Sequence, residues 1–140
     1  MQTSNFAAAK NDPHAIAICR GIPKDFQGRH YAALAPTEQC LKLVQKGILS
    51  PAEFKAAYTR EILDTLDPMA VLNHLGPDAI LLCWEPFNKS CHRRIVAEWL
   101  EAKLGIVVPE LNRRRDESLP YDAQKVQKPR WPPYVKKADR

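Results

Sequence analysis

Two short apolar runs, separated by a succession of helical patterns, constrain the fold of this chain most strongly. Residues 14–19 alternate in polarity and contain two isoleucines, and residues 79–83 form a second run of strand length and composition. Amphipathic patterns predict helices at residues 37–46, 50–66, 69–75 and 91–104, and a short apolar strand follows at 106–108. This order of elements predicts an α/β fold with a small, mostly parallel sheet flanked by helices.

Specific terminal signals mark the boundaries of these helices. Ser50 is placed to be an N-cap, Pro51 suits the first helical position, and Glu53 lies where it can close a capping box. Thr37 can cap the helix at residues 37–46. Gly47 and Gly105 are expected to end the helices that precede them. The predicted buried stripe of the second helix has i+4 spacing and consists of Phe54, Tyr58, Ile62 and Leu66.

Length and composition predict one domain. The chain has 140 residues, of which 45% are hydrophobic, enough for a single core. We expect the domain to span residues 14–111, preceded by a flexible segment at 1–13 and followed by a basic, Pro-rich extended tail at 112–140. The chain has no apolar run long enough for a membrane span and no secretory pattern, which predicts a cytoplasmic protein without membrane contact. In that compartment its four cysteines are expected to be reduced.

The positive charge is confined to the tail. Residues 113–140 contain nine Lys/Arg and four Asp/Glu, whereas the first 112 residues contain twelve of each, so the net charge of +5 comes from the tail. Tyr121, Trp131 and Tyr134 could stack on bases while the basic residues meet phosphates, as in single-strand binders. Alternatively, the Trp-Pro-Pro-Tyr stretch docks on the domain itself, which we favour because exposed aromatic rings readily find apolar surface.

The segment from residue 81 to residue 94 concentrates reactive side chains at a predicted strand-to-helix junction. Cys83 and Glu85 lie two positions apart and are expected to project from one strand face. Ser90 is the expected N-cap of the following helix, which places Cys91, His92 and Arg93 in its first turn. Unpaired backbone N–H groups there attract anions and lower the pKa of a thiol.

These residues suggest an anion-binding catalytic site. The carboxyl ends of parallel strands are the usual ligand edge, and both Arg20 and the junction would meet there. The candidate anion-binding residues are Arg20 and Arg93. The candidate catalytic residues are Cys83 or Cys91 as nucleophile and Glu85 or His92 as general acid/base. The structural alternative makes Cys83 a core residue, Cys91 a small first-turn residue, His92 a packed side chain and Arg93 a salt-bridge partner.

A zinc site is a less favoured interpretation of the same residues. It would combine Cys83, Cys91 and His92 with Cys19 or His74 as a fourth ligand. Seven residues separate the two cysteines, and adjacent Cys91 and His92 suit a single metal poorly, so we predict no metal. The chain also lacks glycine-rich phosphate-loop, nucleophile-elbow and H-E-x-x-H motifs, and its sequence leaves the cofactor unknown.

Several motifs together resemble domain-of-unknown-function family 488 over about residues 14–111. They are Arg20-Gly21-Ile22-Pro23, Leu34-Ala35-Pro36, Leu66-Asp67-Pro68, Cys83-x-Glu85, Cys91-His92-Arg93 and Val108-Pro109-Glu110-Leu111. The resemblance implies a compact α/β domain with its site at the two cysteine motifs. Many family members carry an acidic residue in an Asp-Val-Arg-Ser type sequence where this chain has Ile18-Cys19-Arg20-Gly21, which puts in doubt any catalytic role that depends on that acid. The family supplies no settled activity.

Three classes of function are compatible with these features. The first is a hydrolase or transferase acting on a nucleotide, nucleic acid or other phosphorylated substrate, because the site pairs anion-binding with acid/base groups. The second is a non-catalytic nucleotide- or nucleic-acid-binding module that uses the same pocket and the basic tail. In the third, the domain is a scaffold and the tail binds nucleic acid. The sequence does not separate the first two classes.

Overall fold

A parallel four-stranded sheet forms the centre of the protein. The computed structural model describes residues 1–85 and 91–111. Within them the strand order is β1-β4-β2-β3, and the strands are β1 (Gln2–Asn5), β4 (Ile80–Cys83), β2 (Ala15–Ala17) and β3 (Arg29–His30). Each neighbouring pair is parallel. The predicted α/β class is therefore confirmed, with β2 and β4 at the two apolar runs.

The N-terminal segment is part of this sheet. β1 pairs with β4 in the register Thr3 to Leu81, and helix α1 (Phe6–Ala9) follows it directly. Thr3 and Ser4 are buried even though the strand sequence Gln-Thr-Ser-Asn is polar. The prediction of a flexible segment at residues 1–13 is wrong, because tertiary hydrogen bonds to β4 supply what the local pattern does not indicate.

The expected helices are present. They are α2 (Glu38–Gln45), α3 (Pro51–Glu61), α4 (Pro68–Leu75) and α5 (His92–Leu104). Of these, α2 and α3 begin at their predicted caps. The side chains of Thr37, Ser50 and Asp67 accept hydrogen bonds at the first turns of α2, α3 and α4, and Ser50 forms the predicted capping box with Glu53. Helix α3 ends earlier than predicted, because a 3₁₀ turn at Leu63–Thr65 takes over from it.

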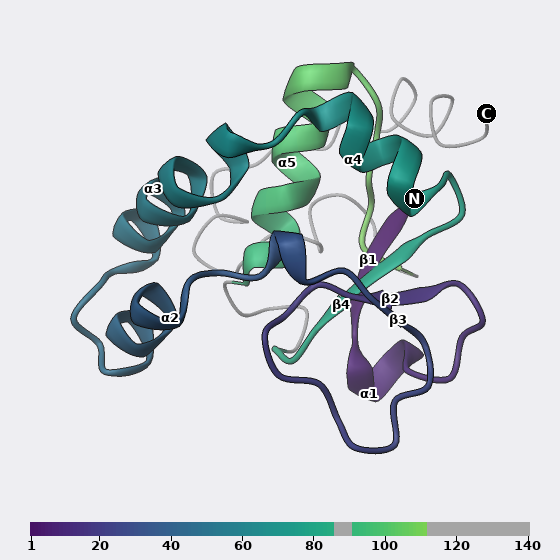
Figure 1. The fold of residues 1–140 in the computed structure, drawn as a ribbon, viewed down its shortest axis with the longest axis horizontal. Coiled ribbons are helices and arrows are strands. Elements are labelled where there is room, and N and C mark those ends of the chain that lie inside the picture. The colour runs from purple at the N-terminus through teal and green to yellow at the C-terminus, as the bar shows by residue number, and fades with distance from the viewer. Residues whose placement is uncertain (86–90, 112–140) are drawn as a thin grey trace.

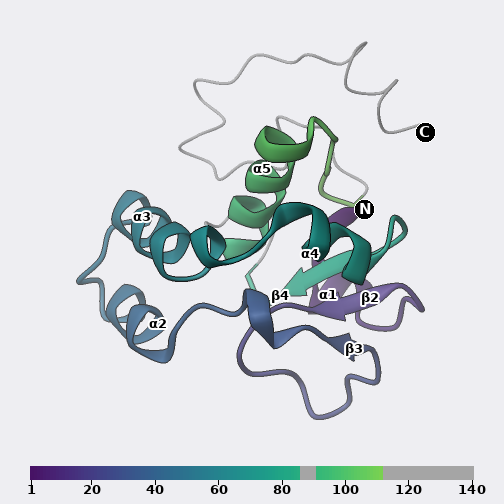
Figure 2. The same cartoon turned by 45° about the horizontal axis from the view of Figure 1, so that its top comes forward.

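Each face of the sheet has its own apolar core. Ile16, Ile18 and Leu81 face the core shared with α3, α4 and α5. Ala17 and Leu82 face a smaller core that contains Phe6 of α1 and Phe26. Figure 1 shows α4 and α5 on one side of the sheet and α1 on the other. In Figure 2 the α2–α3 pair lies to the left of the sheet, on the side toward which the β4 arrow points.

The chain after α5 returns to the sheet in an extended form. Gly105 ends α5 in the left-handed conformation with φ of 67°, as expected for a C-terminal glycine. Residues 106–108 are not a strand, contrary to prediction. The pairing occurs two residues later, where Glu110 bridges Thr3 and the Leu111 N–H donates to the Thr3 carbonyl at 2.7 Å. The short return is therefore anchored by β1, which the sequence analysis did not recognise as a strand.

Two predicted features, the tail at residues 112–140 and the N-cap Ser90, fall on residues that the structure does not describe. Among the helices of the described part of the chain, none is long and apolar enough to cross a membrane.

Candidate functional site

Two cysteines meet where β4 ends and α5 begins. Cys83 is the last residue of β4, and Cys91 is the N-cap of α5, the place expected for Ser90. The two are joined by a disulfide and are almost completely buried, with exposed fractions of 1% and 6%. The prediction that all four cysteines are reduced is therefore wrong for this pair, because the fold brings together sulfurs eight positions apart. Cys19 and Cys40 are free thiols.

Arg93 connects the disulfide to a buried carboxylate. Its Nε and Nη2 donate to the two carboxylate oxygens of Glu110 at 3.1 and 2.8 Å. Its Nη1 donates to Cys83 Sγ at 3.1 Å and to the carbonyl of Glu85 at 2.7 Å. The Arg93 side chain is fully buried and forms an ion pair with the buried carboxylate of Glu110. This is the salt-bridge role that the sequence analysis held as its alternative to anion binding.

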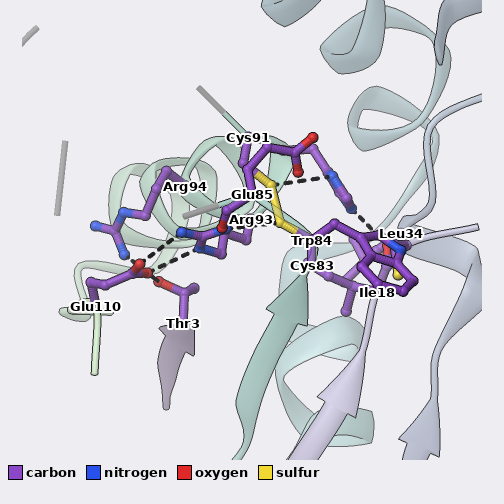
Figure 3. Close-up of a disulfide and its surroundings, with 12 residues drawn as sticks. Thr3, Ile18, Leu34, Cys83, Trp84, Glu85, Cys91, Arg93, Arg94 and Glu110 are labelled. Atoms are coloured by element: carbon purple, nitrogen blue, oxygen red, sulfur yellow. Dashed lines mark hydrogen bonds and ion pairs between the residues drawn. A yellow bond between two sulfur atoms is a disulfide. The ribbon is translucent and has the colours of Figure 1, made fainter. Parts of the chain in front are cut away.

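A wider polar network supports Glu110. Thr3 donates its hydroxyl to Glu110 Oε1 at 2.6 Å and accepts a hydrogen bond from Arg94 Nη1 at 2.7 Å. Arg94 Nη1 also donates to the carbonyl of Val108 at 2.9 Å. Figure 3 shows this network on one side of the disulfide. No role of Thr3 or Glu110 was predicted from the sequence. The only signal for Glu110 was its place in a family-like motif.

His92 lies on the other side of the disulfide and is held in one orientation. Its Nε2 is 2.7 Å from the carbonyl oxygen of Ile18, which can only accept, so Nε2 carries the proton. The pKa of His92 is lowered to about 4, mainly by burial; the hydrogen bond to the Ile18 carbonyl opposes this shift and the positive charge of Arg93 adds to it, so the ring is neutral at pH 7. The Nδ1 lone pair therefore faces Cys91 Sγ at 3.8 Å. His92 is therefore suited to orient a thiol, and its imidazole is a weak base.

Three exposed residues, Arg20, Trp84 and Glu85, follow the carboxyl ends of β2 and β4. Arg20 is exposed, and its Nε and Nη2 donate to the carbonyl of Pro36 at 3.2 and 2.9 Å. Trp84 is 55% exposed and donates its indole N–H to the carbonyl of Gly21 at 2.8 Å. Glu85 is exposed and follows the end of β4. These side chains are accessible to a ligand, whereas the disulfide is buried.

The structure thus brings most of the predicted residues together. Cys83 contacts Cys91 and Arg93, and Cys91 contacts His92. Arg20 is linked to this group only indirectly. His92 is hydrogen-bonded to the carbonyl of Ile18, which lies directly after β2 and two residues before Arg20. The expectation that Arg20 and Arg93 face one anion pocket stays a prediction for Arg20, since Arg93 has an internal partner.

Three potential metal ligands are close together at the same place. The side-chain ligand atoms of Cys83, Cys91 and His92 all lie within 4.8 Å of one another. The two sulfurs are bonded to each other, so a metal could use both only after reduction. The fourth ligands considered from the sequence are engaged elsewhere. The Cys19 thiol donates to the carbonyl of Gly21, and the ring of His74 stacks on Tyr31.

A cavity of about 710 Å³ opens at the opposite, amino edge of the sheet. Its lining includes Gln2 at the start of β1, Asp78 and Ile80 at the start of β4, and Leu111. None of the predicted site residues lines it. Size alone is a weaker indication of function than the reactive groups gathered at the carboxyl edge.

Comparisons with known proteins identify a family. A protein-family model described as the active DUF488-N3 subclade, DUF488-N3a, matches residues 6–104. The match includes the whole Cys83–Arg93 region and begins directly after β1. Neither a curated protein nor a solved structure matches the chain.

Proposed function

The chain belongs to the DUF488 family, and we propose that it is an enzyme, a hydrolase or transferase, acting on a nucleotide, nucleic acid or other phosphorylated substrate. The observation that supports this most strongly is the position of the exposed Arg20 guanidinium. In the chain Arg20 stands between Ile18 and Gly21, whose carbonyls accept hydrogen bonds from His92 and Trp84, and its own guanidinium donates to the carbonyl of Pro36. An anion-binding side chain is thus tied to the same strand end as the reactive end of α5.

The roles of the residues follow from their exposure and partners. Arg20 would hold a phosphate, and the exposed face of Trp84 offers a stacking surface for a base. After reduction, Cys91 would act as the nucleophile, with its S–H directed at Nδ1 of His92. The exposed carboxylate of Glu85 would supply the acid/base group. Arg93 stays with Glu110 and positions the sulfurs.

The test is binding and turnover by the full chain, kept reduced, with a panel of ribonucleoside 5′-phosphates and a single-stranded DNA oligonucleotide. Arg20→Ala should weaken binding about tenfold or more, because a hydrogen bond to a charged group contributes about 1.5–3 kcal/mol. Arg60→Ala, which removes an exposed cation from α3, is the matched control. Cys91→Ser should abolish turnover and leave binding intact. Binding that is insensitive to Arg20→Ala would contradict this location of the site.

The alternative is a binding module without catalysis, favoured by the confinement of the net charge of +5 to residues 113–140. In that case the panel binds but yields no product. If the tail contacts phosphates, truncation after Asn112 should abolish a strongly salt-dependent affinity for the oligonucleotide and leave the domain folded. If Trp131 and Tyr134 dock on the domain, the same truncation should instead lower its melting temperature.

A further inference from the structure

We propose that Cys83 and Cys91 form a redox couple that exchanges with low-molecular-weight thiols, with Cys91 as the attacked sulfur and Cys83 as the leaving thiolate. The two sulfurs are bonded in this structure but have opposite surroundings. Cys83 Sγ faces an N–H donor of the Arg93 guanidinium at 3.1 Å. Cys91 Sγ faces the Nδ1 atom of His92 at 3.8 Å.

These surroundings determine which sulfur leaves. A thiolate on Cys83 gains a charge-assisted hydrogen bond from Arg93. A thiolate on Cys91 would face the lone pair of Nδ1, because Nε2 holds the ring proton against the Ile18 carbonyl. Disulfide exchange is faster when the better-stabilised thiolate leaves. Cys91 is also the more exposed residue, at 6% against 1%, so attack on its sulfur fits both access and charge.

The exchange balances without any further reactant. A thiolate RS⁻ attacks Cys91 Sγ, a mixed disulfide forms, the bond to Cys83 breaks, and its electron pair stays on Cys83 Sγ beside Arg93. A second thiolate attacks the external sulfur of the mixed disulfide, which forms RSSR and releases the thiolate of Cys91. The two protons of the attacking thiols balance the two cysteine thiols. The protein disulfide is reduced and two small thiols are oxidised, and the reverse sequence restores the pair.

Glu110 is a positioning residue for this chemistry. Its two oxygens hold Nε and Nη2 of Arg93, so that only Nη1 points toward the sulfur. The Thr3 hydroxyl in turn donates to Glu110 at 2.6 Å. A guanidinium held at three nitrogens keeps its direction, whereas a lysine offers one nitrogen and cannot bridge both groups.

The test uses the full chain, purified without reductant and equilibrated with glutathione at defined ratios of its thiol and disulfide forms. Free thiols are then trapped with iodoacetamide and located by peptide mass spectrometry. Cys83 and Cys91 should appear and disappear as a pair, with Cys40→Ser as a control that leaves the pair unchanged. The glutathione adduct on Cys91 in Cys83→Ser should exceed that on Cys83 in Cys91→Ser by about tenfold or more.

A second variant tests the role assigned to Arg93. Arg93→Lys should move the exchange equilibrium with glutathione about tenfold toward the disulfide, which is about 30 mV for a two-electron couple. Arg60→Lys, on the exposed surface of α3, should leave it unchanged. Circular dichroism establishes that both variants are folded. The measurement needs no substrate, so its outcome is independent of the phosphorylated-substrate hypothesis.

Several outcomes would overturn the proposal. One is a protein that keeps both thiols free after equilibration with glutathione disulfide. Equal adducts on the two cysteines, or an unchanged equilibrium in Arg93→Lys, would refute the assignment of attacked and leaving sulfurs. A stoichiometric zinc ion on the reduced protein that blocks exchange would replace the redox couple with a metal site at Cys83, Cys91 and His92.

Discussion

Two buried polar side chains, Tyr58 and His92, have defined hydrogen-bond partners. Tyr58 is fully buried, and its hydroxyl donates to the Leu34 carbonyl at 2.6 Å. The Tyr58 ring also makes an edge contact with the imidazole of His92, at 5.6 Å between centroids. These two side chains link the loop before α2 to the reactive end of α5. Their behaviour on substitution can therefore be predicted from single interactions.

Tyr58→Phe should lower the free energy of unfolding by about 1–3 kcal/mol. The substitution leaves the buried carbonyl of Leu34 without its donor while the ring packing is preserved. Urea denaturation followed by fluorescence measures the effect. Tyr31→Phe is the control, since the hydroxyl of Tyr31 has no hydrogen bond among the described residues. A Tyr58→Phe variant as stable as the parent would show that Leu34 finds another donor.

The stability of the protein should fall as pH decreases from about 6.5 to about 4. Burial lowers the pKa of His92 from 6.5 to about 4 in the folded state, so between these values the unfolded chain binds more protons. This contribution is complete above pH 6.5, and its loss on acidification is on the order of 3 kcal/mol. Unfolding free energies measured across this range should show a steeper pH dependence in the parent than in His92→Gln. Parallel curves would contradict the neutral, buried state of His92.

Helices in this fold are specified largely by their ends. Helix α3 has a complete capping box, in which the Glu53 N–H donates to Ser50 Oγ and the Ser50 N–H donates to Glu53 Oε1, at 3.1 and 2.8 Å. Helix α5 differs, because its N-cap Cys91 makes no capping hydrogen bond with its side chain. The sulfur at that position is instead used in the disulfide. A position that would normally hold a capping side chain is thus occupied by a disulfide-bonded cysteine.

Ser50→Ala should cost about 1 kcal/mol of stability, because it removes the acceptor for the Glu53 N–H at the exposed start of α3. Thermal denaturation detects this as a lower melting temperature. Glu53→Gln keeps an acceptor for the Ser50 N–H and is the matched control, with a smaller expected effect. Equal losses in both variants would indicate that the charge of Glu53, and not the cap, stabilises α3.

The two ends of the described chain are joined through a buried ionic network. Thr3 of β1 and Glu110 after α5 are 107 positions apart, yet their side chains are hydrogen-bonded, and both lie next to Arg93 and Arg94 (Figure 3). Buried ion pairs of this kind are costly to break on one side only, because the remaining charge stays desolvated. The site therefore depends on segments that are remote in sequence.

Glu110→Ala should destabilise the protein by about 3–5 kcal/mol, since it leaves the fully buried Arg93 without its counter-charge. Asp25→Ala, which breaks the exposed ion pair with Lys10, should have a much smaller effect and is the control. The double variant Glu110→Met with Arg93→Met should be more stable than Glu110→Ala, because neither charge is left buried. Chemical denaturation of the three variants measures these differences. Similar costs for Glu110→Ala and Asp25→Ala would contradict a desolvated pair.

The local sequence was sufficient to predict the parallel α/β class, the strands β2 and β4, and the caps of α2 and α3, because each signal lies within a few residues of the structure it specifies. It also located the two cysteine motifs. The strand β1, the Cys83–Cys91 bond and the pairing of Arg93 with Glu110 did not follow from it. A polar strand is recognisable only by its neighbour in the sheet, and whether an arginine meets a ligand or an internal carboxylate depends on which chain segments the fold packs together.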